Sequence, residues 1–296
     1  MFTDVTHLFC DIDDFCQAFQ PEMNQNLIAT GAKTRLRSTS LALSEIMTIL
    51  VLFHSSRYRD FKHFYFFLKT YHLSEFPNLV SYNRFVELTS TALIPLCSFL
   101  ETKKGKSLGV NFIDSTSIVV CNNKRIFNHK VFEGFAKRGK TTMGWFFGFK
   151  LHIVVNDIGE LLAFKLTPGN TDDRKPLKDG FANNIFGSLY GDKGYISKSL
   201  FDFLYQKGIT LVTPLKRKME NALMPLMDKI LLKKRSIIET INDQLKNISQ
   251  IQHTRHRSIS NFLVNLICGL IAYTYQSKKP SIKIRIEEIG RVPFCI

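Results

Sequence analysis

The order of strand and helix patterns after residue 106 restricts the fold more than any other feature of the sequence. Apolar runs long enough for β-strands lie at residues 108–116, 146–155, 161–167, 185–191 and 210–213. A turn signal at residues 156–159 separates the second run from the third, so these two strands are predicted to form a hairpin. Helices are predicted at residues 176–183 and 197–206, and across residues 229–276.

Three strands, a crossover helix, a strand, a helix, a strand and further helices are the order of an α/β protein with a mixed sheet of the ribonuclease-H type. We therefore predict a ribonuclease-H-like mixed sheet with helices on both faces, formed by residues 106–278. A small helical domain, residues 1–105, is predicted to precede it, because apolar residues recur there three and four positions apart. Residues 279–296 are predicted to be a C-terminal tail.

The predicted N-terminal helices have two interpretations. They form either a helix-turn-helix that binds DNA ends or a plain helical bundle with a solvated charged face. Ser81 is a predicted N-cap for a helix that continues to about Leu100. The acidic cluster at residues 11–14 lies in an amphipathic pattern, so we interpret it as a solvated helix face rather than a metal site.

The charge of the chain predicts a polyanionic partner. The 296 residues include 40 Lys and Arg against 25 Asp and Glu, for a formal charge of +15. Much of the excess lies in residues 101–150, with net charge +7, and residues 215–260, with net charge +6. Such clusters are typical of surfaces that contact nucleic-acid phosphates, although a solvated basic surface without a partner is the alternative.

The same sequence argues against a membrane protein and against a secreted one. No window reaches the roughly 20 apolar residues that a membrane-spanning helix requires. The 6 cysteines include no Cys-x-x-Cys pair, which disfavours both a disulfide framework and a zinc site. We therefore expect a cytoplasmic protein, associated with the nucleoid through DNA.

Two aspartates follow the first and fourth predicted strands. Asp114 closes the apolar run Val110-Asn111-Phe112-Ile113, where an unpaired carboxylate is costly, and Asp192 comes directly after the fourth run. If both strands are central in the sheet, their carboxyl ends bring the two side chains together, and a divalent metal relieves their repulsion. Taken singly, each aspartate is equally well explained as a turn residue or a helix cap.

A third acid lies on a helix. Apolar residues recur at positions 238, 241, 245 and 248, which predicts an amphipathic helix with this stripe on the core. A second stripe beside it consists of Arg235, Glu239, Asn242 and Lys246. The simple alternative is a solvated face with an ordinary Arg235–Glu239 pair four residues apart.

Together these residues resemble the DDE transposases of bacterial insertion sequences, in the branch with a Tyr-x2-Arg-x3-Glu-x6-Lys signature. The resemblance covers about residues 108–275. Its local motifs are Phe112-Ile-Asp-Ser-Thr116, Gly148-Phe-Lys-Leu-His152, Leu166-Thr-Pro-Gly-Asn170, Gly191-Asp-Lys-Gly-Tyr195 and Arg235-x3-Glu239-x6-Lys246. One position departs from the signature, because Leu232 occupies the place of the tyrosine. A hydroxyl contact to DNA is therefore missing there or comes from elsewhere.

The resemblance implies that Asp114, Asp192 and Glu239 are the catalytic residues and hold two Mg²⁺ or Mn²⁺ ions. It implies an enzyme that binds the terminal inverted repeats of its element, hydrolyses the ends and joins the freed 3′-hydroxyl to target DNA. A homodimer is expected, because two ends must be brought together. The predicted DNA-binding residues are Arg235, Lys246, Lys193, Lys150, Lys137, Arg138, Lys140, Arg255 and Arg257.

Four further residues have competing interpretations. His152 supports the metal site if its strand neighbours that of Asp114, and Asn242 shares the stripe of Glu239. Asp173 supports the site or, with Asp172, caps the following helix. Trp145, the only tryptophan, is interpreted as a packing residue at the start of a strand rather than a base-stacking one.

Other functional classes remain open at this stage. A ribonuclease-H-like nuclease or resolvase would keep the three acids but cut without joining. A catalytically silent DNA-binding protein would not need them. A basic structural or ribosome-associated protein has no use for acids at the ends of strands.

Overall fold

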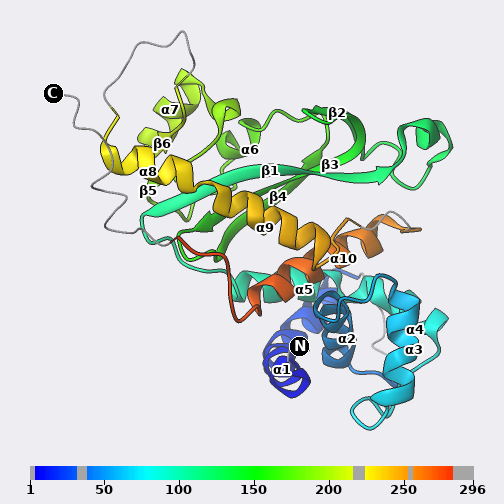
Figure 1. The fold of residues 1–296 in the computed structure, drawn as a ribbon. Helices are drawn as coiled ribbons and strands as arrows, with labels where there is room; N and C mark the ends of the chain where they lie inside the picture. Colours follow the sequence, from blue (N-terminus) through cyan, green and yellow to red (C-terminus); the bar gives the residue numbers. More distant parts are fainter. Residues whose placement is uncertain (1–3, 32–38, 216–223, 253–255, 283–296) are drawn as a thin grey trace. The chain divides into compact units, whose positions relative to one another are not determined.

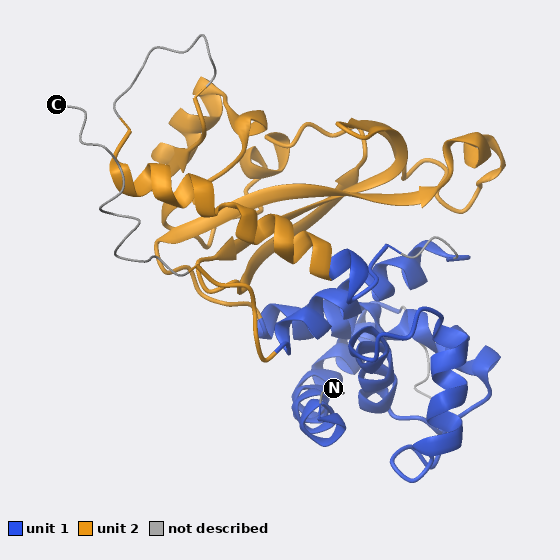
Figure 2. Ribbon diagram, viewed as in Figure 1, with its two compact units in different colours: residues 1–103, 245–276 blue, residues 104–244, 277–296 orange. Residues whose placement is uncertain are grey.

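The chain forms two compact units in a computed structural model that describes residues 4–31, 39–215, 224–252 and 256–282 (Figure 2). Unit 1 comprises residues 1–103 and 245–276, and unit 2 comprises residues 104–244 and 277–296. This grouping differs from the predicted division, because residues 245–276 pack with the N-terminal helices rather than with the sheet. The domain limits at residues 105 and 278 stay predictions, since packing alone does not define a separately folding domain.

Unit 1 contains helices joined by turns and loops, and no strand, in its described residues (Figure 1). Its helices are α1 (Val5–Ala29), α2 (Leu43–Ser55), α3 (Phe61–Tyr71), α4 (Tyr82–Thr89), the 3₁₀ turn η1 (Ser90–Ala92), α5 (Leu93–Thr102) and α10 (Ile259–Thr274). Helix α2 is buried from Ile46 to His54, and α1, α4 and α10 pack on it. A helix that is buried over nine consecutive residues requires neighbours on every side there.

The N-terminal predictions hold in part. Ser81 is the N-cap of α4, and its Oγ accepts a 3.3 Å hydrogen bond from the backbone N–H of Arg84. The predicted continuous helix to Leu100 is wrong, because α4 ends at Thr89 and the 3₁₀ turn η1 precedes α5. Asp11 is not simply solvated, because its Oδ2 accepts 2.6 Å bonds from the Nζ of Lys103 and from the hydroxyl of Tyr275.

Unit 2 contains a six-stranded mixed sheet. Its strands are β1 (Val110–Cys121), β2 (Lys137–Thr141), β3 (Gly144–Asn156), β4 (Leu161–Pro168), β5 (Gly187–Tyr190) and β6 (Ile209–Val212). The order is β2-β3-β1-β5-β6, and β4 also pairs with β3. Strand β1 is antiparallel to β3 and parallel to β5, and β5 is parallel to β6. This mixed topology is compatible with the predicted ribonuclease-H-like fold, and the β3–β4 hairpin is confirmed.

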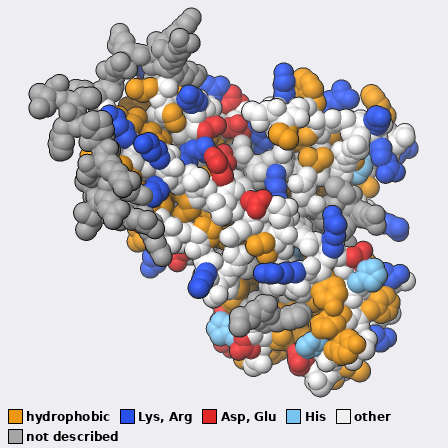
Figure 3. Space-filling view, in the orientation of Figure 1, with side chains coloured by type: hydrophobic (Ala, Val, Ile, Leu, Met, Phe, Trp, Pro, Cys, Tyr) orange, Lys and Arg blue, Asp and Glu red, His pale blue; other side chains and the backbone are white. Residues whose placement is uncertain are grey.

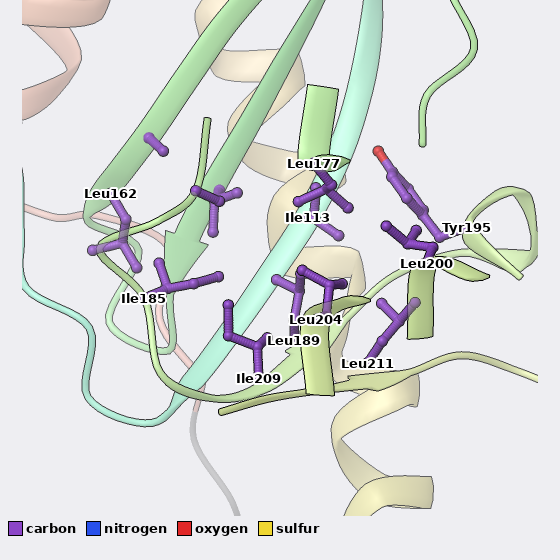
Figure 4. Close-up of a cluster of buried hydrophobic side chains, with 13 residues drawn as sticks. Ile113, Leu162, Leu177, Ile185, Leu189, Tyr195, Leu200, Leu204, Ile209 and Leu211 are labelled. Carbon is purple, nitrogen blue, oxygen red and sulfur yellow. The ribbon is translucent and has the colours of Figure 1, made fainter. Parts of the chain in front are cut away.

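Helices cover the two faces of this sheet. Ile113 points into a cluster of apolar side chains with Leu177 of α6 (Lys175–Lys178) and Leu200 of α7 (Lys198–Tyr205) (Figure 4). Alternate strand residues face opposite sides, so Phe112 points the other way and stacks on Tyr190. The Tyr190 hydroxyl donates a 2.7 Å bond to Asp228 of α8 (Leu226–Lys234).

Three elements differ from the predictions. Strand β2 lies in a segment predicted as a loop, because Lys137-Arg-Gly-Lys-Thr141 has no apolar alternation. Helix α6 has only 4 residues, whereas a helix at residues 176–183 is predicted. The helical stretch from residue 229 is interrupted at Arg235, which ends α8 before α9 (Ser236–Asn247) begins.

Candidate active site

Asp114 and Asp192 occupy equivalent positions on neighbouring parallel strands. Phe112 of β1 pairs with Tyr190 of β5, and each aspartate lies two residues beyond its member of that pair. Asp192 is the N-cap of the 3₁₀ turn η3 (Lys193–Tyr195), and its Oδ1 accepts a 2.9 Å hydrogen bond from the N–H of Gly194. The cap interpretation of Asp192 is therefore confirmed, and the parallel register also directs both carboxylates to one end of the sheet.

The environment of Asp114 favours its protonated form. The pKa of this carboxyl is raised from 3.8 to about 6, chiefly by burial and to a smaller extent by the charges of Asp192 and Glu239. The guanidinium of Arg235 and the backbone N–H of Ser115 act in the opposite direction. A carboxylate that is buried and close to two other acids is a group that a cation would stabilise.

Helix α9 and the residue before it bring three members of the predicted polar stripe to Asp114. The Asn242 Nδ2 donates a 3.0 Å hydrogen bond to Asp114 Oδ2. Arg235 lies between two acids, with its Nη2 2.6 Å from Oε1 of Glu239 and its Nη1 3.9 Å from Oδ1 of Asp114. The predicted Arg235–Glu239 pair is thus present, between an Arg235 side chain that is 18% exposed and a Glu239 side chain that is 57% exposed.

The donor chemistry of this cluster fits Mg²⁺ or Mn²⁺, which prefer carboxylate oxygens. The Arg235 guanidinium currently supplies positive charge between Asp114 and Glu239, where a metal ion would supply it. Within the described ranges, no three His, Cys, Asp or Glu side chains lie close enough to share one ion. For all three acids to share one ion, their carboxylates would therefore have to come closer together than they are in this structure.

A second polar network lies on the other face of β1, because Ser115 points away from the Asp114 face. Asp173 Oδ1 accepts a 2.9 Å bond from the Ser115 hydroxyl and a 3.0 Å bond from Lys150 Nζ. His152 is fully buried beside this group, 4.0 Å from the same oxygen, and its Nε2 is 2.9 Å from the hydroxyl of Thr167. Burial lowers the pKa of His152 to about 4, so the ring is neutral at pH 7.

The network shows where two residues with competing interpretations, Asp173 and His152, lie. Asp173 joins this side-chain network, and Asp172 accepts a hydrogen bond from the backbone N–H of Arg174, but in the described part of the chain no side chain caps helix α6. His152 does neighbour the β1 strand, in register with Ser115. Among the described residues, its polar side-chain contacts are with Thr167 and Asp173, not with Asp114.

Tyr195 is a residue of this region to which the sequence analysis assigned no role. Its ring packs against Gly191 and Ile113, the residues that directly precede the two aspartates. Figure 4 shows the hydroxyl oxygen pointing away from the apolar cluster. This hydroxyl is buried without a hydrogen-bond partner, and burial, together with the charges of nearby aspartates, raises its pKa well above 10. The only sequence signal for Tyr195 was its place at the end of the motif Gly191-Asp-Lys-Gly-Tyr195.

Most of the predicted DNA-binding cations are on surfaces. Lys193 follows Asp192 directly and is exposed, as are Lys137, Arg138 and Lys140 on β2. Lys150 is largely buried against Asp173. Lys246 lies on α9, Arg257 is exposed in unit 1, and Arg255 lies outside the described residues. A space-filling view shows a group of acidic side chains over unit 2, with Lys and Arg side chains around it (Figure 3).

Trp145 does not have the packing role that the sequence suggested. It begins β3, but its side chain is 61% exposed. The backbone carbonyl of Trp145 accepts a 2.6 Å bond from Asn123 Nδ2, so the main chain is held while the ring remains on the surface.

The comparison with protein families agrees with this site. The model of the transposase DDE domain matches residues 104–259, a segment that contains Asp114, Asp192 and Glu239 and is more than half of the chain. The fold and the match define a DDE enzyme domain, a class that generally uses divalent metals. The chain belongs to the transposase DDE domain family.

Two further observations complete the comparison. No curated protein matches the chain. Within the described residues, no helix is both long enough and apolar enough to cross a bilayer.

Proposed function

We propose that the protein is the transposase of an insertion sequence, which binds the terminal inverted repeats, hydrolyses the element ends and joins each 3′-hydroxyl to target DNA. The observation that carries the proposal is the parallel pairing of β1 with β5, which puts Asp114 and Asp192 at equivalent positions on neighbouring strands. Helix α9 adds two contacts there, one between Asn242 and Asp114 and one between Glu239 and Arg235. The family match supports the same reading.

In this proposal Asp114, Asp192 and Glu239 hold two Mg²⁺ or Mn²⁺ ions. When bound, the ions activate water or a 3′-hydroxyl and stabilise the leaving oxygen. Asn242 holds the Asp114 carboxylate in place through its 3.0 Å bond. Arg235 neutralises Glu239 until the site is loaded, and then contacts a phosphate near the cut, for which its planar guanidinium is well suited.

The remaining cations bind the DNA backbone. Lys193 lies beside the cut, and Lys137, Arg138 and Lys140 follow the DNA along the sheet edge. Lys246, Arg255 and Arg257 extend the contact. We further propose a homodimer that brings two ends together, an N-terminal helical domain at residues 1–105 that recognises them, and a cytoplasmic location on the nucleoid.

A strand-joining assay separates this function from the alternatives. The substrate is a pre-nicked duplex that carries the DNA bracketing the reading frame, incubated with supercoiled target DNA and Mg²⁺. A transposase joins the 3′-end to the target. A resolvase or repair nuclease cuts an intact end but forms no joined product, and a silent DNA-binding protein does neither. Cutting without joining under these conditions would overturn the proposal.

A further inference from the structure

The turn that follows helix α9 is buried, and a side chain of another helix bonds to its backbone. Ser249 is 1% exposed and Ile251 is fully buried, although both lie in a connection between helices. The imidazole of His54, on α2, contacts the backbone carbonyl of Ser249 through Nδ1. A carbonyl oxygen only accepts, so Nδ1 carries a proton and donates this hydrogen bond. Connections between helices usually run over the surface, so a buried and bonded one calls for an explanation.

Gly269 of α10 completes the contacts that hold the turn at residues 249–251. A Cβ at position 269 would lie 2.3 Å from Cγ2 of Ile251, and 3.5 Å from both His54 Nδ1 and the Ser249 oxygen. The turn therefore rests directly on α10, at a point where any side chain would push Ile251 away. The side-chain amide of Asn265, one turn earlier on α10, also donates to the carbonyl of Ile251, at 3.4 Å.

This turn closes the C-terminal end of α9. The last carbonyls of a helix have no partner inside the helix. Here the carbonyl of Leu245 accepts a 3.1 Å hydrogen bond from the N–H of Ile251, so the chain folds back on the end of the helix. To do so, Gln250 adopts a φ of 49°, a left-handed conformation that residues other than glycine rarely adopt. Such a conformation persists where its surroundings hold it, and the residues on either side of it are held by His54 and Gly269.

The end of α9 matters for the candidate active site because Asn242 lies close to it. The helix ends at Asn247, and Asn242, little more than one turn earlier, donates the hydrogen bond to Asp114. In an α-helix each N–H bonds to the carbonyl four residues earlier, so the last turn, residues 245–247, bonds back to residues 241–243. Helix ends fray before helix centres do. Release of the turn at residues 249–251 would therefore let the last turn of α9 fray and loosen Asn242.

We propose that His54 is a positioning residue for the candidate active site: its bond to Ser249 keeps the last turn of α9 helical and so maintains the hydrogen bond from Asn242 to Asp114. His54 is 3% exposed and bonds to backbone, so it acts through α9 rather than on the substrate. The inference rests on the proposed function, because Asp114 is taken as a catalytic acid. It gives unit 1, beside the proposed recognition of DNA ends, a share in holding that acid.

The first test is hydrogen exchange of the full-length protein, without metal or DNA, at the backbone amides of residues 241–247. His54→Phe fills the space of the ring but donates no hydrogen bond. We expect these amides to exchange about tenfold faster in this variant than in wild type, and those of β1 and β3 to be unchanged, because a buried carbonyl has lost its donor. His54→Asn should restore most of the protection, since its amide nitrogen is the same number of bonds from Cα as Nδ1.

Two further variants keep the test independent of the folding of His54→Phe. Gly269→Ala retains the imidazole and displaces Ile251 instead, and should give the same local increase in exchange. The matched control is Phe85→Leu, which weakens the core of unit 1 at a fully buried side chain on α4 and should leave exchange at residues 241–247 close to that of wild type.

The second test is single-turnover cleavage of an element end with Mg²⁺, at a temperature where circular dichroism shows every variant folded. His54→Phe and Gly269→Ala should cut about tenfold more slowly, because the acid is held less well, with DNA affinity in Ca²⁺ unchanged. His54→Asn should cut at close to the wild-type rate.

Three results would overturn the positioning role. They are wild-type exchange at residues 241–247 in both His54→Phe and Gly269→Ala, faster exchange over the whole chain without rescue by His54→Asn, and wild-type cleavage by a variant whose α9 amides exchange faster. Faster local exchange in the variants of a protein whose wild type cuts no DNA would instead leave the hold on α9 standing and overturn the transposase function.

Discussion

The side-chain amide of Asn242 donates a 3.0 Å hydrogen bond to Oδ2 of Asp114, and so joins helix α9 to strand β1. Both residues are largely buried, so the bond is formed away from bulk water, where its loss is costly. The bond ties the position of Asp114, the first of the proposed catalytic acids, to the helix that carries Glu239.

Asn242→Asp should reduce DNA cleavage. The change replaces a donor with a second carboxylate beside Asp114, which raises the pKa of Asp114 and favours its protonated form. We expect cleavage at pH 7 to fall by about tenfold or more, from repulsion worth more than about 1.4 kcal/mol. Thr240→Asp adds the same charge at an exposed position on α9 and should cleave normally. Equal activity of the two variants would contradict this role of Asn242.

The pH dependence of stability should report the buried state of Asp114. Its pKa is raised from 3.8 to about 6 in the folded chain, so folding favours the proton. This stabilisation is fully present below about pH 3.8 and is lost as the pH rises through 6. For the metal-free protein, the difference between these two pKa values corresponds to on the order of 3 kcal/mol.

Asp114→Asn removes that titration. The free energy of unfolding of the variant, relative to that of wild type, should increase between pH 4 and pH 7.5. Urea denaturation of both proteins at each pH, in the presence of a chelator, measures this difference. A difference between the two proteins that does not change with pH would show that Asp114 is not a raised-pKa group.

Loss of the hydroxyl should have different effects on the stability of the fold at two buried tyrosines. Tyr190 donates a 2.7 Å bond to Asp228, so Tyr190→Phe should destabilise the fold by about 1 kcal/mol or more. The Tyr195 hydroxyl has no partner, so Tyr195→Phe should leave the melting temperature unchanged or raise it. Thermal unfolding of the matched pair measures this directly, and an equal loss in both variants would mean that the Tyr195 hydroxyl is bonded.

DNA affinity should depend steeply on salt. If the cationic surfaces contact about six to ten phosphates, the slope of log affinity against log salt should lie between about −5 and −9. Removing the charge of Lys137 should make the slope shallower by about one and weaken all DNA sequences alike. A flat salt dependence would contradict the backbone contacts.

The sequence predicted the strands that are apolar and missed the one that is not. Strands β1, β3 and β4 each contain an apolar run, whereas β2 is a charged segment that pairs through its backbone with β3. The break at Arg235 was also missed, because the helical periodicity continues on both sides of it. Patterns in side chains do not reveal backbone pairing or a local turn.

The sequence predicted which site residues follow a strand and which share one face of a helix, but not which of them touch. The stripe of Arg235, Glu239 and Asn242 followed from helical spacing, and its contact with Asp114 needed the tertiary structure. The exposure of Trp145 was not predictable, because the sequence at the start of a strand does not indicate which side chains the neighbouring strand leaves open.

Cleavage of an element end by Glu239→Gln is the most direct test of the central claim. The substrate is an intact duplex that carries the DNA bracketing the reading frame, with Mg²⁺, and binding is measured in parallel in Ca²⁺. The account predicts that wild type cuts the duplex, and that Glu239→Gln binds it with unchanged affinity but yields no product. Full cleavage by Glu239→Gln with Mg²⁺ would contradict the assignment of Asp114, Asp192 and Glu239 as the catalytic acids.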